Sequence, residues 1–251
     1  MATINLVIQG KGGVGKTFTS IMIAQYLQDK GIDSTNIDTD PVNNSFSAYS
    51  SLSAQPLKIV ENNAIKPKAF DELMELLIET NKTVVIDNGA SSFLPLVSYL
   101  LENECFEILK DSGHIINIHS IIAGGQALAD TMVNLDQMLQ HLPPYVNFIV
   151  WLNEKDGDIA HNSDPNLGFE KSTIYTKNKA RIKSIIHLPK PSQDQLLDLR
   201  KALSLKITLS EAIASADFKV MEKQRIKLYQ RNVYQQLDNA IIFESEIQEK
   251  A

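Results

Sequence analysis

The stretch Gly10-Lys11-Gly12-Gly13-Val14-Gly15-Lys16-Thr17 decides the fold of this chain. It is a complete G-x-x-x-x-G-K-[ST] phosphate loop, preceded by an apolar run at residues 3–9 and followed by a helix-like run from Phe18. Glycines let successive backbone N–H groups turn inward around phosphate oxygens, at the positive end of the helix that follows. We therefore expect residues 10–18, Gly10 to Phe18, to bind a nucleotide, with Lys16 on the β- and γ-phosphates and Thr17 on Mg²⁺. An ordinary glycine-rich turn is the alternative.

The size and composition of the chain are those of one α/β domain. It has 251 residues, of which 43% are hydrophobic and 22% charged, so we expect a single domain over residues 1–251 with C-terminal helices at about 193–240. No run approaches the roughly 18 apolar residues that a membrane span needs, and no signal-peptide pattern opens the chain. The single cysteine, Cys105, excludes an internal disulfide and fits a reducing compartment. These features predict a cytoplasmic protein.

Short β-rich runs alternate with helical runs, the pattern of a doubly wound, mainly parallel sheet with helices on both faces. The predicted strands are Thr3–Gln9, Ser34–Asp38, Thr83–Asp87, His114–His119, Asn147–Asn153 and Arg181–Leu188. The predicted helices cover residues 16–30, 68–81, 92–104, 126–142, 171–178, 193–203 and 218–239. Between residues 41 and 67 we expect at most a short strand at Leu57–Val60, and residues 154–168 form a long loop. Right-handed crossovers would bring the strand ends that carry Gln9, Asp38 and Asp87 to one edge of the sheet.

Acidic residues at two predicted strand ends extend the nucleotide site. Asp87 follows the apolar run Val84-Val85-Ile86, the Walker-B form, in which a carboxylate accepts from a Mg²⁺-bound water or from Thr17. Asp38 and Asp40 follow the strand at residues 34–38. Carboxylates are useful there because Mg²⁺ prefers oxygen ligands and keeps waters that need acceptors. The alternative at Asp40-Pro41 is a plain turn.

Lys11 directly follows the first glycine, where an ordinary phosphate loop does not require a lysine. With the segment from Lys11 to Thr17, the run Asp38-Thr39-Asp40-Pro41 and Asp87, the chain resembles the ParA/MinD superfamily of ATPases from residue 3 to about residue 190. Its opening run at residues 7–16 and the run at residues 37–43 are most similar to the StbB/TraL group. These are ParA-like ATPases encoded in plasmid stability and conjugation operons.

The resemblance implies that two copies pair around two ATP molecules. Lys11 would cross to the nucleotide of the other copy, where a cation neutralises charge on the transferring phosphoryl group. Asp38 would hold the water shell of Mg²⁺, and Asp40 would orient or deprotonate the attacking water. Asn153 would read the adenine edge and Pro189 would pack near the base. A solvated lysine, a strand-ending asparagine and a turn proline are the alternatives.

Two positions depart from the family pattern. Asn88-Gly89-Ala90 replaces the proline-containing continuation that is usual after the Walker-B acid, and Val42 stands where a glutamine is frequent. In the family these loops respond to the γ-phosphate and touch the partner subunit. The departures therefore affect the details of switching but not nucleotide binding.

The last predicted helix carries a cationic stripe. Lys219, Lys223, Lys227 and Arg231 recur every four residues, opposite an apolar stripe made of Ile226, Tyr229, Val233, Leu237 and Ile241. Such a stripe could bind DNA phosphates without reading sequence. The alternative is a solvated helix face.

The sequence as a whole predicts a slow ATPase that dimerises with ATP and releases a partner after hydrolysis. We expect a role in plasmid partition, positioning or conjugation, with a DNA-bound adaptor protein as partner. Residues 243–251 are acidic and lack the bulky basic tail of a membrane-binding helix, so no membrane partner is expected. One alternative is a nucleotide-dependent interaction module with little turnover. The other is a small-molecule ligase or kinase of the dethiobiotin synthetase type, which needs no lysine in trans.

Overall fold

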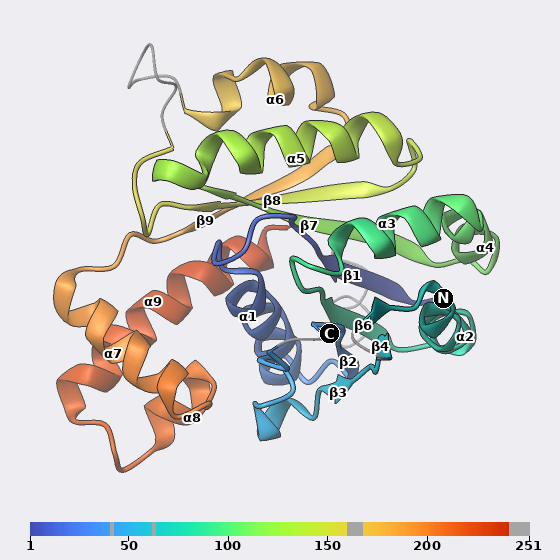
Figure 1. Ribbon diagram of the computed structural model, residues 1–251. Coiled ribbons are helices and arrows are strands. Elements are labelled where there is room, and N and C mark those ends of the chain that lie inside the picture. Colours follow the sequence, from blue (N-terminus) through green and yellow to red (C-terminus); the bar gives the residue numbers. More distant parts are fainter. Residues whose placement is uncertain (41–42, 62–63, 160–167, 241–251) are drawn as a thin grey trace.

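A seven-stranded sheet lies at the centre of the computed structural model, which describes residues 1–40, 43–61, 64–159 and 168–240 (Figure 1). The strand order is β3-β2-β6-β1-β7-β8-β9, and all neighbours run parallel. The strands are β1 Thr3–Val7, β2 Ser34–Asp38, β3 Gln55–Pro56, β6 Thr83–Asp87, β7 Ile115–Ala123, β8 Asn147–Asn153 and β9 Ile182–Leu188. A separate antiparallel pair consists of β4 Val60–Glu61 and β5 Ala64–Ile65.

Helices cover both faces of the sheet, which confirms the predicted doubly wound α/β fold (Figure 1). One face carries α1 Lys16–Asp29, α7 Gln193–Ser204, α8 Leu209–Ala214 and α9 Val220–Asp238. The other carries α2 Phe70–Glu79, α3 Phe93–Glu102, α4 Cys105–Asp111, α5 Leu128–His141 and α6 Thr173–Asn178. Successive strand residues alternate between two apolar cores, as Trp151 packs in the first core and its neighbours Val150 and Leu152 pack in the second.

Several predicted boundaries differ from the observed ones. β7 continues to Ala123 rather than ending at His119, because residues 120–123 are also buried between the two helical layers. The predicted helix at residues 92–104 ends at Glu102, and a separate helix α4 follows Glu104, whose φ of 50° interrupts the helical path. The short helix α8 was not predicted, although Thr208 and Glu211 form a capping box at its start.

The predicted short strand at Leu57–Val60 is wrong. Pairing instead involves Gln55–Pro56, which joins β2, and Val60–Glu61, which joins β5. Pairings of two residues are too short to leave the alternation of apolar and polar residues that indicates a strand. Pro41, Val42, Ile241, residues 160–167 of the predicted long loop and the tail at residues 243–251 lie outside the described residues.

A row of hydrogen-bonded side chains crosses the centre of the sheet. Asn117 on β7 donates from Nδ2 to Asn5 Oδ1 on β1 at 3.2 Å and accepts from Asn147 Nδ2 on β8 at 3.1 Å. His119 Nε2 lies 3.1 Å from the same Asn5 oxygen, and His119 Nδ1 accepts from Trp151 Nε1 at 3.0 Å. These contacts place the proton on Nε2, and burial lowers the pKa of His119 to about 3, so the ring is neutral. A one-residue slip would break every pair, so the row fixes the strand register.

The loop that follows β7 and the loop that follows β8 pack directly against each other, backbone to backbone. A Cβ on Gly124 would lie 1.8 Å from the carbonyl oxygen of Gly157, and one on Gly125 would lie 2.5 Å from that of Asp156. Gly125 and Gly157 also have φ of 69° and 155°. The Gly124 N–H donates to the Asn153 carbonyl at 2.9 Å. This glycine crossing, formed by Gly124, Gly125 and Gly157, holds the loop after β8 against the start of α5.

Candidate functional site

The phosphate loop connects β1 to α1 at the carboxyl edge of the sheet. Gly13 and Gly15 have φ of 75° and 106°, a region that favours glycine, and α1 begins directly afterwards at Lys16. The loop lines a hollow of about 450 Å³ together with residues from the loops after β2 and β6. Its lining residues are Gly12, Gly13, Gly15, Lys16, Thr17, Phe18, Asp40, Asn43, Ser45, Ala90 and Ser91. The structure thus brings most of the predicted phosphate loop and Asp40 into one hollow, which we call the phosphate hollow.

Lys16 is buried at the start of α1, and its Nζ donates to the Lys11 carbonyl at 3.0 Å. Burial lowers the pKa of the Lys16 ammonium, while the nearby charges of Asp87 and Asp40 oppose that change. Lys16 therefore lies inside the loop with two carboxylates close to it. A bound phosphate would meet this cation at the base of the phosphate hollow.

Asp87 ends β6 and is almost fully buried. Its Oδ1 accepts from Ser20 Oγ at 2.8 Å, and its carboxylate also accepts from the Thr17 hydroxyl. Burial raises the pKa of Asp87 to about 6, against the opposing effect of these hydrogen bonds and of the Lys16 charge. The Thr17 hydroxyl and the Asp87 carboxylate are adjacent hard oxygen donors, a donor set that fits Mg²⁺ carrying several waters.

Asp38 is fully buried and organises the loop that follows β2. Its Oδ2 accepts from the backbone N–H groups of Phe46 and Ser47 at 3.0 and 2.9 Å, and its Oδ1 accepts from the Asp40 N–H at 3.0 Å. Both carboxylate oxygens therefore hold backbone, and one of them holds the backbone of Asp40. The predicted contact of Asp38 with magnesium-bound waters stays a prediction.

The loop after β6 contacts the loop after β2 through its unusual residues. Asn88 Oδ1 accepts from Thr39 Oγ1 and from Ser92 Oγ, each at 2.9 Å. A Cβ on Gly89 would lie 2.8 Å from Asp40 Cγ, so Asp40 occupies the space that a side chain would need. Asn88 and Gly89, two of the residues that depart from the family pattern, therefore join the loop after β6 to the loop that carries Asp40.

Helix α5 supports the phosphate loop from behind. Gln9 Nε2 donates to the Thr131 carbonyl at 3.3 Å, and Gln9 Oε1 accepts from Asn134 Nδ2 at 2.6 Å. Lys11 Nζ donates to Asp130 Oδ2 at 2.7 Å, in a pair that is exposed to solvent. Lys11 therefore points toward α5 of its own chain and not into the phosphate hollow. The three α5 residues could not be identified from the sequence, because contacts between distant segments leave no local motif.

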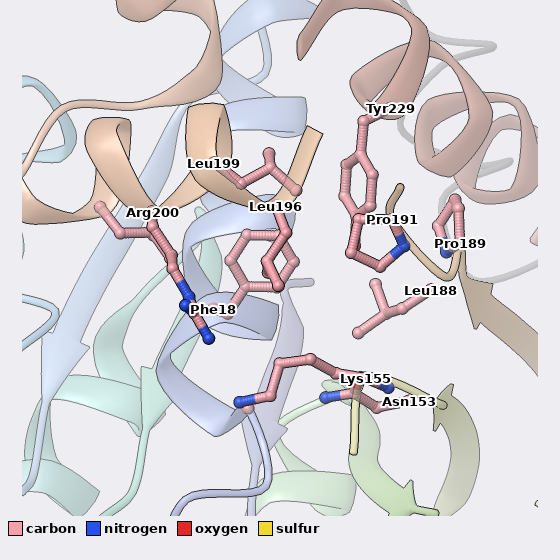
Figure 2. Close-up of a pocket in the computed structure, with 12 residues that line it drawn as sticks. Phe18, Asn153, Lys155, Leu188, Pro189, Pro191, Leu196, Leu199, Arg200 and Tyr229 are labelled. Atoms are coloured by element: carbon pink, nitrogen blue, oxygen red, sulfur yellow. The ribbon is translucent and has the colours of Figure 1, made fainter. Parts of the chain in front are cut away.

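A second pocket, of about 170 Å³ and mainly apolar, adjoins the phosphate hollow (Figure 2). We call it the base pocket; it shares Gly15 and Phe18 with the phosphate hollow. Its other lining residues are Asn153, Lys155, Leu188, Pro189, Pro191, Leu196, Leu199, Arg200, Leu203 and Tyr229. An apolar pocket beside a phosphate site suits a nucleotide base. Asn153 and Pro189 both line this pocket, and their contacts with adenine stay a prediction. Arg200 was not identified from the sequence.

Asn153 is engaged with the phosphate loop. Its Nδ2 donates to the Val14 carbonyl at 2.9 Å, and its Oδ1 accepts from the Lys155 N–H at 3.1 Å. A Cβ on Gly15 would lie 2.9 Å from the same Nδ2. Each polar atom of the amide therefore has a partner within the protein, and the reading of an adenine edge by Asn153 stays a prediction.

The predicted cationic stripe lies on the surface of α9. Lys219, Lys227 and Arg231 are exposed and Lys223 is partly exposed, while the opposing residues Ile226, Tyr229, Val233 and Leu237 are buried. Across the described ranges, Lys223, Lys227 and Arg231 have no carboxylate within ion-pair distance. The stripe is therefore open to an anionic partner.

Comparison with known proteins identifies a family model that matches the chain, and proteins that are similar to it in sequence or fold. The family model of the CobQ/CobB/MinD/ParA nucleotide binding domain matches residues 6–214. Two Escherichia coli proteins named TraL are 42% and 40% identical to the chain over 243 residues, covering 96% of this chain and 100% of each relative. The MinD cell division protein of Aquifex aeolicus superposes with a TM-score of 0.52 at 16% identity, over 94% of this chain and 97% of that one. The Aquifex aeolicus MinC:MinD complex gives 0.52 at 13% identity, over 94% and 96%. At such identities the solved structures show the fold alone.

Proposed function

We propose, from the premise that this chain belongs to the CobQ/CobB/MinD/ParA family of nucleotide-binding domains, that it is an ATP-driven switch. The observation that carries the proposal is the phosphate hollow, in which the phosphate loop, the buried Lys16 and Asp40 lie together beside a base pocket. The similarity to TraL proteins supports a role in plasmid conjugation or stability. The whole chain acts as one ATPase domain in this proposal, and it would work in the cytoplasm.

The chemistry assigned to the site is phosphoryl transfer to water. Lys16 and the loop N–H groups bind the β- and γ-phosphates, and Thr17 and Asp87 hold Mg²⁺, which neutralises charge on the phosphate oxygens when bound. Asp40 lies on the wall of the phosphate hollow, where it can accept a proton from the attacking water. Because such catalysis is mainly positioning and charge neutralisation, these parts suffice for slow turnover.

Dimerisation would complete the site through Lys11. In the single chain its ammonium is paired with Asp130, and that pair is exposed on both sides. Exposed ion pairs of this kind contribute only about 0–1 kcal/mol, so the contact exchanges readily for a stronger one. We propose that Lys11 leaves Asp130 and reaches the nucleotide bound to a second copy, where it stabilises the charge that develops during transfer.

The test is the solution mass of the Asp40→Ala variant, measured by light scattering with Mg·ATP and with Mg·ADP. We expect a doubling of the 28.0 kDa mass with ATP only, because loss of the catalytic carboxylate stalls hydrolysis while binding persists. The additional change Lys11→Ala should abolish the dimer, whereas the additional change Lys82→Ala, on an exposed lysine paired with Asp33, should leave it intact. A monomer in every condition would contradict the switch.

Turnover assays separate the remaining candidates. A switch should hydrolyse ATP slowly and be stimulated by a DNA-bound adaptor protein encoded near it. A nucleotide-dependent interaction module should bind ATP and remain unstimulated. An enzyme of the dethiobiotin synthetase type should turn over only with a small carboxylate or amine substrate, and should not need Lys11.

The cationic stripe of α9 is proposed to contact DNA phosphates. The double change Lys219→Glu and Lys227→Glu should weaken non-specific DNA binding and lower the slope of log K against log salt by about 2. Fluorescence anisotropy on one duplex at several salt concentrations measures both quantities. The matched pair Lys177→Glu and Lys183→Glu, on α6 and β9, should change the slope less. If the two double variants changed DNA binding equally, the stripe would be an ordinary solvated helix face that does not contact DNA.

A further inference from the structure

The base pocket has few polar side chains that remain available for a ligand. Both polar atoms of Asn153 have partners within the protein. The Lys155 amine lies 3.5 Å from the Asp156 carboxylate. Among the described lining residues, the only other side chains with polar atoms belong to Arg200 and Tyr229. Contact with a base must therefore come mainly from apolar packing, from Tyr229 and from two cations. These cations are Arg200 and Lys155, whose exposed ion pair with Asp156 exchanges readily.

Arg200 reaches the base pocket from α7. The residue is exposed, and in the part of the chain that the structure describes its guanidinium has no hydrogen bond or ion pair. Figure 2 shows the Arg200 side chain extending from α7 among the residues that line the pocket, which also include Phe18 and Lys155. Leu196 and Leu199 of the same helix line the pocket as well. Helix α7 thus forms one wall of the base pocket and carries the Arg200 guanidinium, which is available to contact a ligand.

That wall is anchored to the neighbouring helix. Asp198 on α7 accepts from Arg225 on α9, with 2.5 Å to Nε and 3.3 Å to Nη2. Lys201 Nζ lies 3.2 Å from Glu222 Oε1, also on α9. Two ion pairs on the side of α7 that faces α9 therefore hold the helix in place. Arg200 projects from a fixed element and not from a loop, which makes it suitable for orienting a ligand.

We propose that Arg200 stacks its guanidinium on the base of the bound purine nucleotide, and that Asn153 is a positioning residue that holds the phosphate loop. The proposal rests on the proposed function, which supplies the nucleotide as ligand. A planar guanidinium stacks on aromatic rings, and a lysine ammonium cannot reproduce that plane. The amide of Asn153 fixes the Val14 carbonyl against Gly15, so its loss should disturb the phosphate loop and leave the base pocket open.

Two probes separate the base from the phosphates: Mg·ATP, and magnesium tripolyphosphate, which has no base. Isothermal titration calorimetry gives the affinity of each probe for the wild type and for Arg200→Ala, Arg200→Lys, Asn153→Ala and Asn153→Ser. Lys82→Ala is the control, on an exposed lysine that pairs with Asp33 and does not line the pocket. Thermal melting without ligand shows which variants are folded, and the serine variant serves if the alanine variant is not.

We expect both Arg200 variants to weaken Mg·ATP about 5- to 30-fold and to leave tripolyphosphate unchanged. The Asn153 variants should weaken the two probes by the same factor, and Lys82→Ala should change neither. An unchanged ATP affinity in Arg200→Ala, or an equal loss for both probes, would overturn the stacking assignment. A loss confined to ATP in the Asn153 variants would overturn the positioning role.

The wild-type protein separates failure of this inference from failure of the proposed function. If it binds ATP no more tightly than tripolyphosphate, the base pocket makes no contribution and the inference is wrong, although phosphate binding stands. If it binds neither probe, the proposed function itself is wrong.

Discussion

Replacing Lys16 with alanine is expected to weaken Mg·ATP binding at least about 100-fold, because charge-assisted hydrogen bonds to two phosphates are lost from a buried position. The loss should be larger than that of any other single side chain in the phosphate hollow. Lys16 is enclosed by the loop, where its Nζ donates to the Lys11 carbonyl at 3.0 Å. Calorimetric titration of the purified variant with Mg·ATP measures the effect.

The control is Lys82→Ala, the same change on an exposed lysine next to Thr83, at the opposite end of β6 from Asp87. It should bind ATP as the wild type does. The Lys16→Ala protein must also melt within a few degrees of the wild type without ligand, so that the loss is one of contact. Wild-type affinity in folded Lys16→Ala protein would refute the phosphate-loop assignment.

Replacing Gly124 with alanine is expected to lower the free energy of unfolding by about 2–4 kcal/mol. The new Cβ would lie 1.8 Å from the Gly157 carbonyl oxygen, and the atom it meets is backbone, which cannot rotate aside. The loop after β8 must therefore move away from α5, and Asn153, whose carbonyl accepts from the Gly124 N–H, should move with it. Denaturant unfolding followed by circular dichroism measures the change.

Gly168→Ala is the matched control, because a Cβ there meets no atom of the described residues within 4 Å and its φ is −65°. It should unfold within about 0.5 kcal/mol of the wild type. If Gly124→Ala were equally stable, the close approach of the two loops would be unimportant to the fold.

Much of the fold could be predicted from the sequence because its signals are local. Strands such as Thr83–Asp87 are apolar runs that end in an acid, and α1 starts directly at the phosphate loop. Parallel strands place their carboxyl ends at one edge, so the neighbourhood of Asp87 and Asp38 follows from topology. The capping box of Thr208 and Glu211 is also a local signal, and it marks the start of α8.

The details of the site could not be predicted, because they depend on contacts between distant segments. Nothing local to Lys11 indicates that Asp130 lies 2.7 Å from it. Nothing near Asp38 indicates that backbone N–H groups use both of its oxygens. The position of Arg200 depends on how α7 packs against α9, and no short motif encodes that packing. Motifs identified the chemistry of the site, and tertiary packing decided which side chains hold which others.

The row of hydrogen-bonded asparagines at the centre of the sheet also has a consequence for folding during synthesis. Asn5 and Asn117 are separated by 112 positions, and Asn147 follows 30 positions later. The first strand leaves the ribosome early, and its Asn5 side chain must stay hydrated until its partners Val84 and Asn117 have been synthesised. Pairing of strands that are far apart in the sequence is slow, because the entropic cost of closing the loop comes before the contacts that stabilise the pair. The unfinished sheet therefore exposes apolar edges throughout translation, and a chaperone that shields them should raise the yield of native protein.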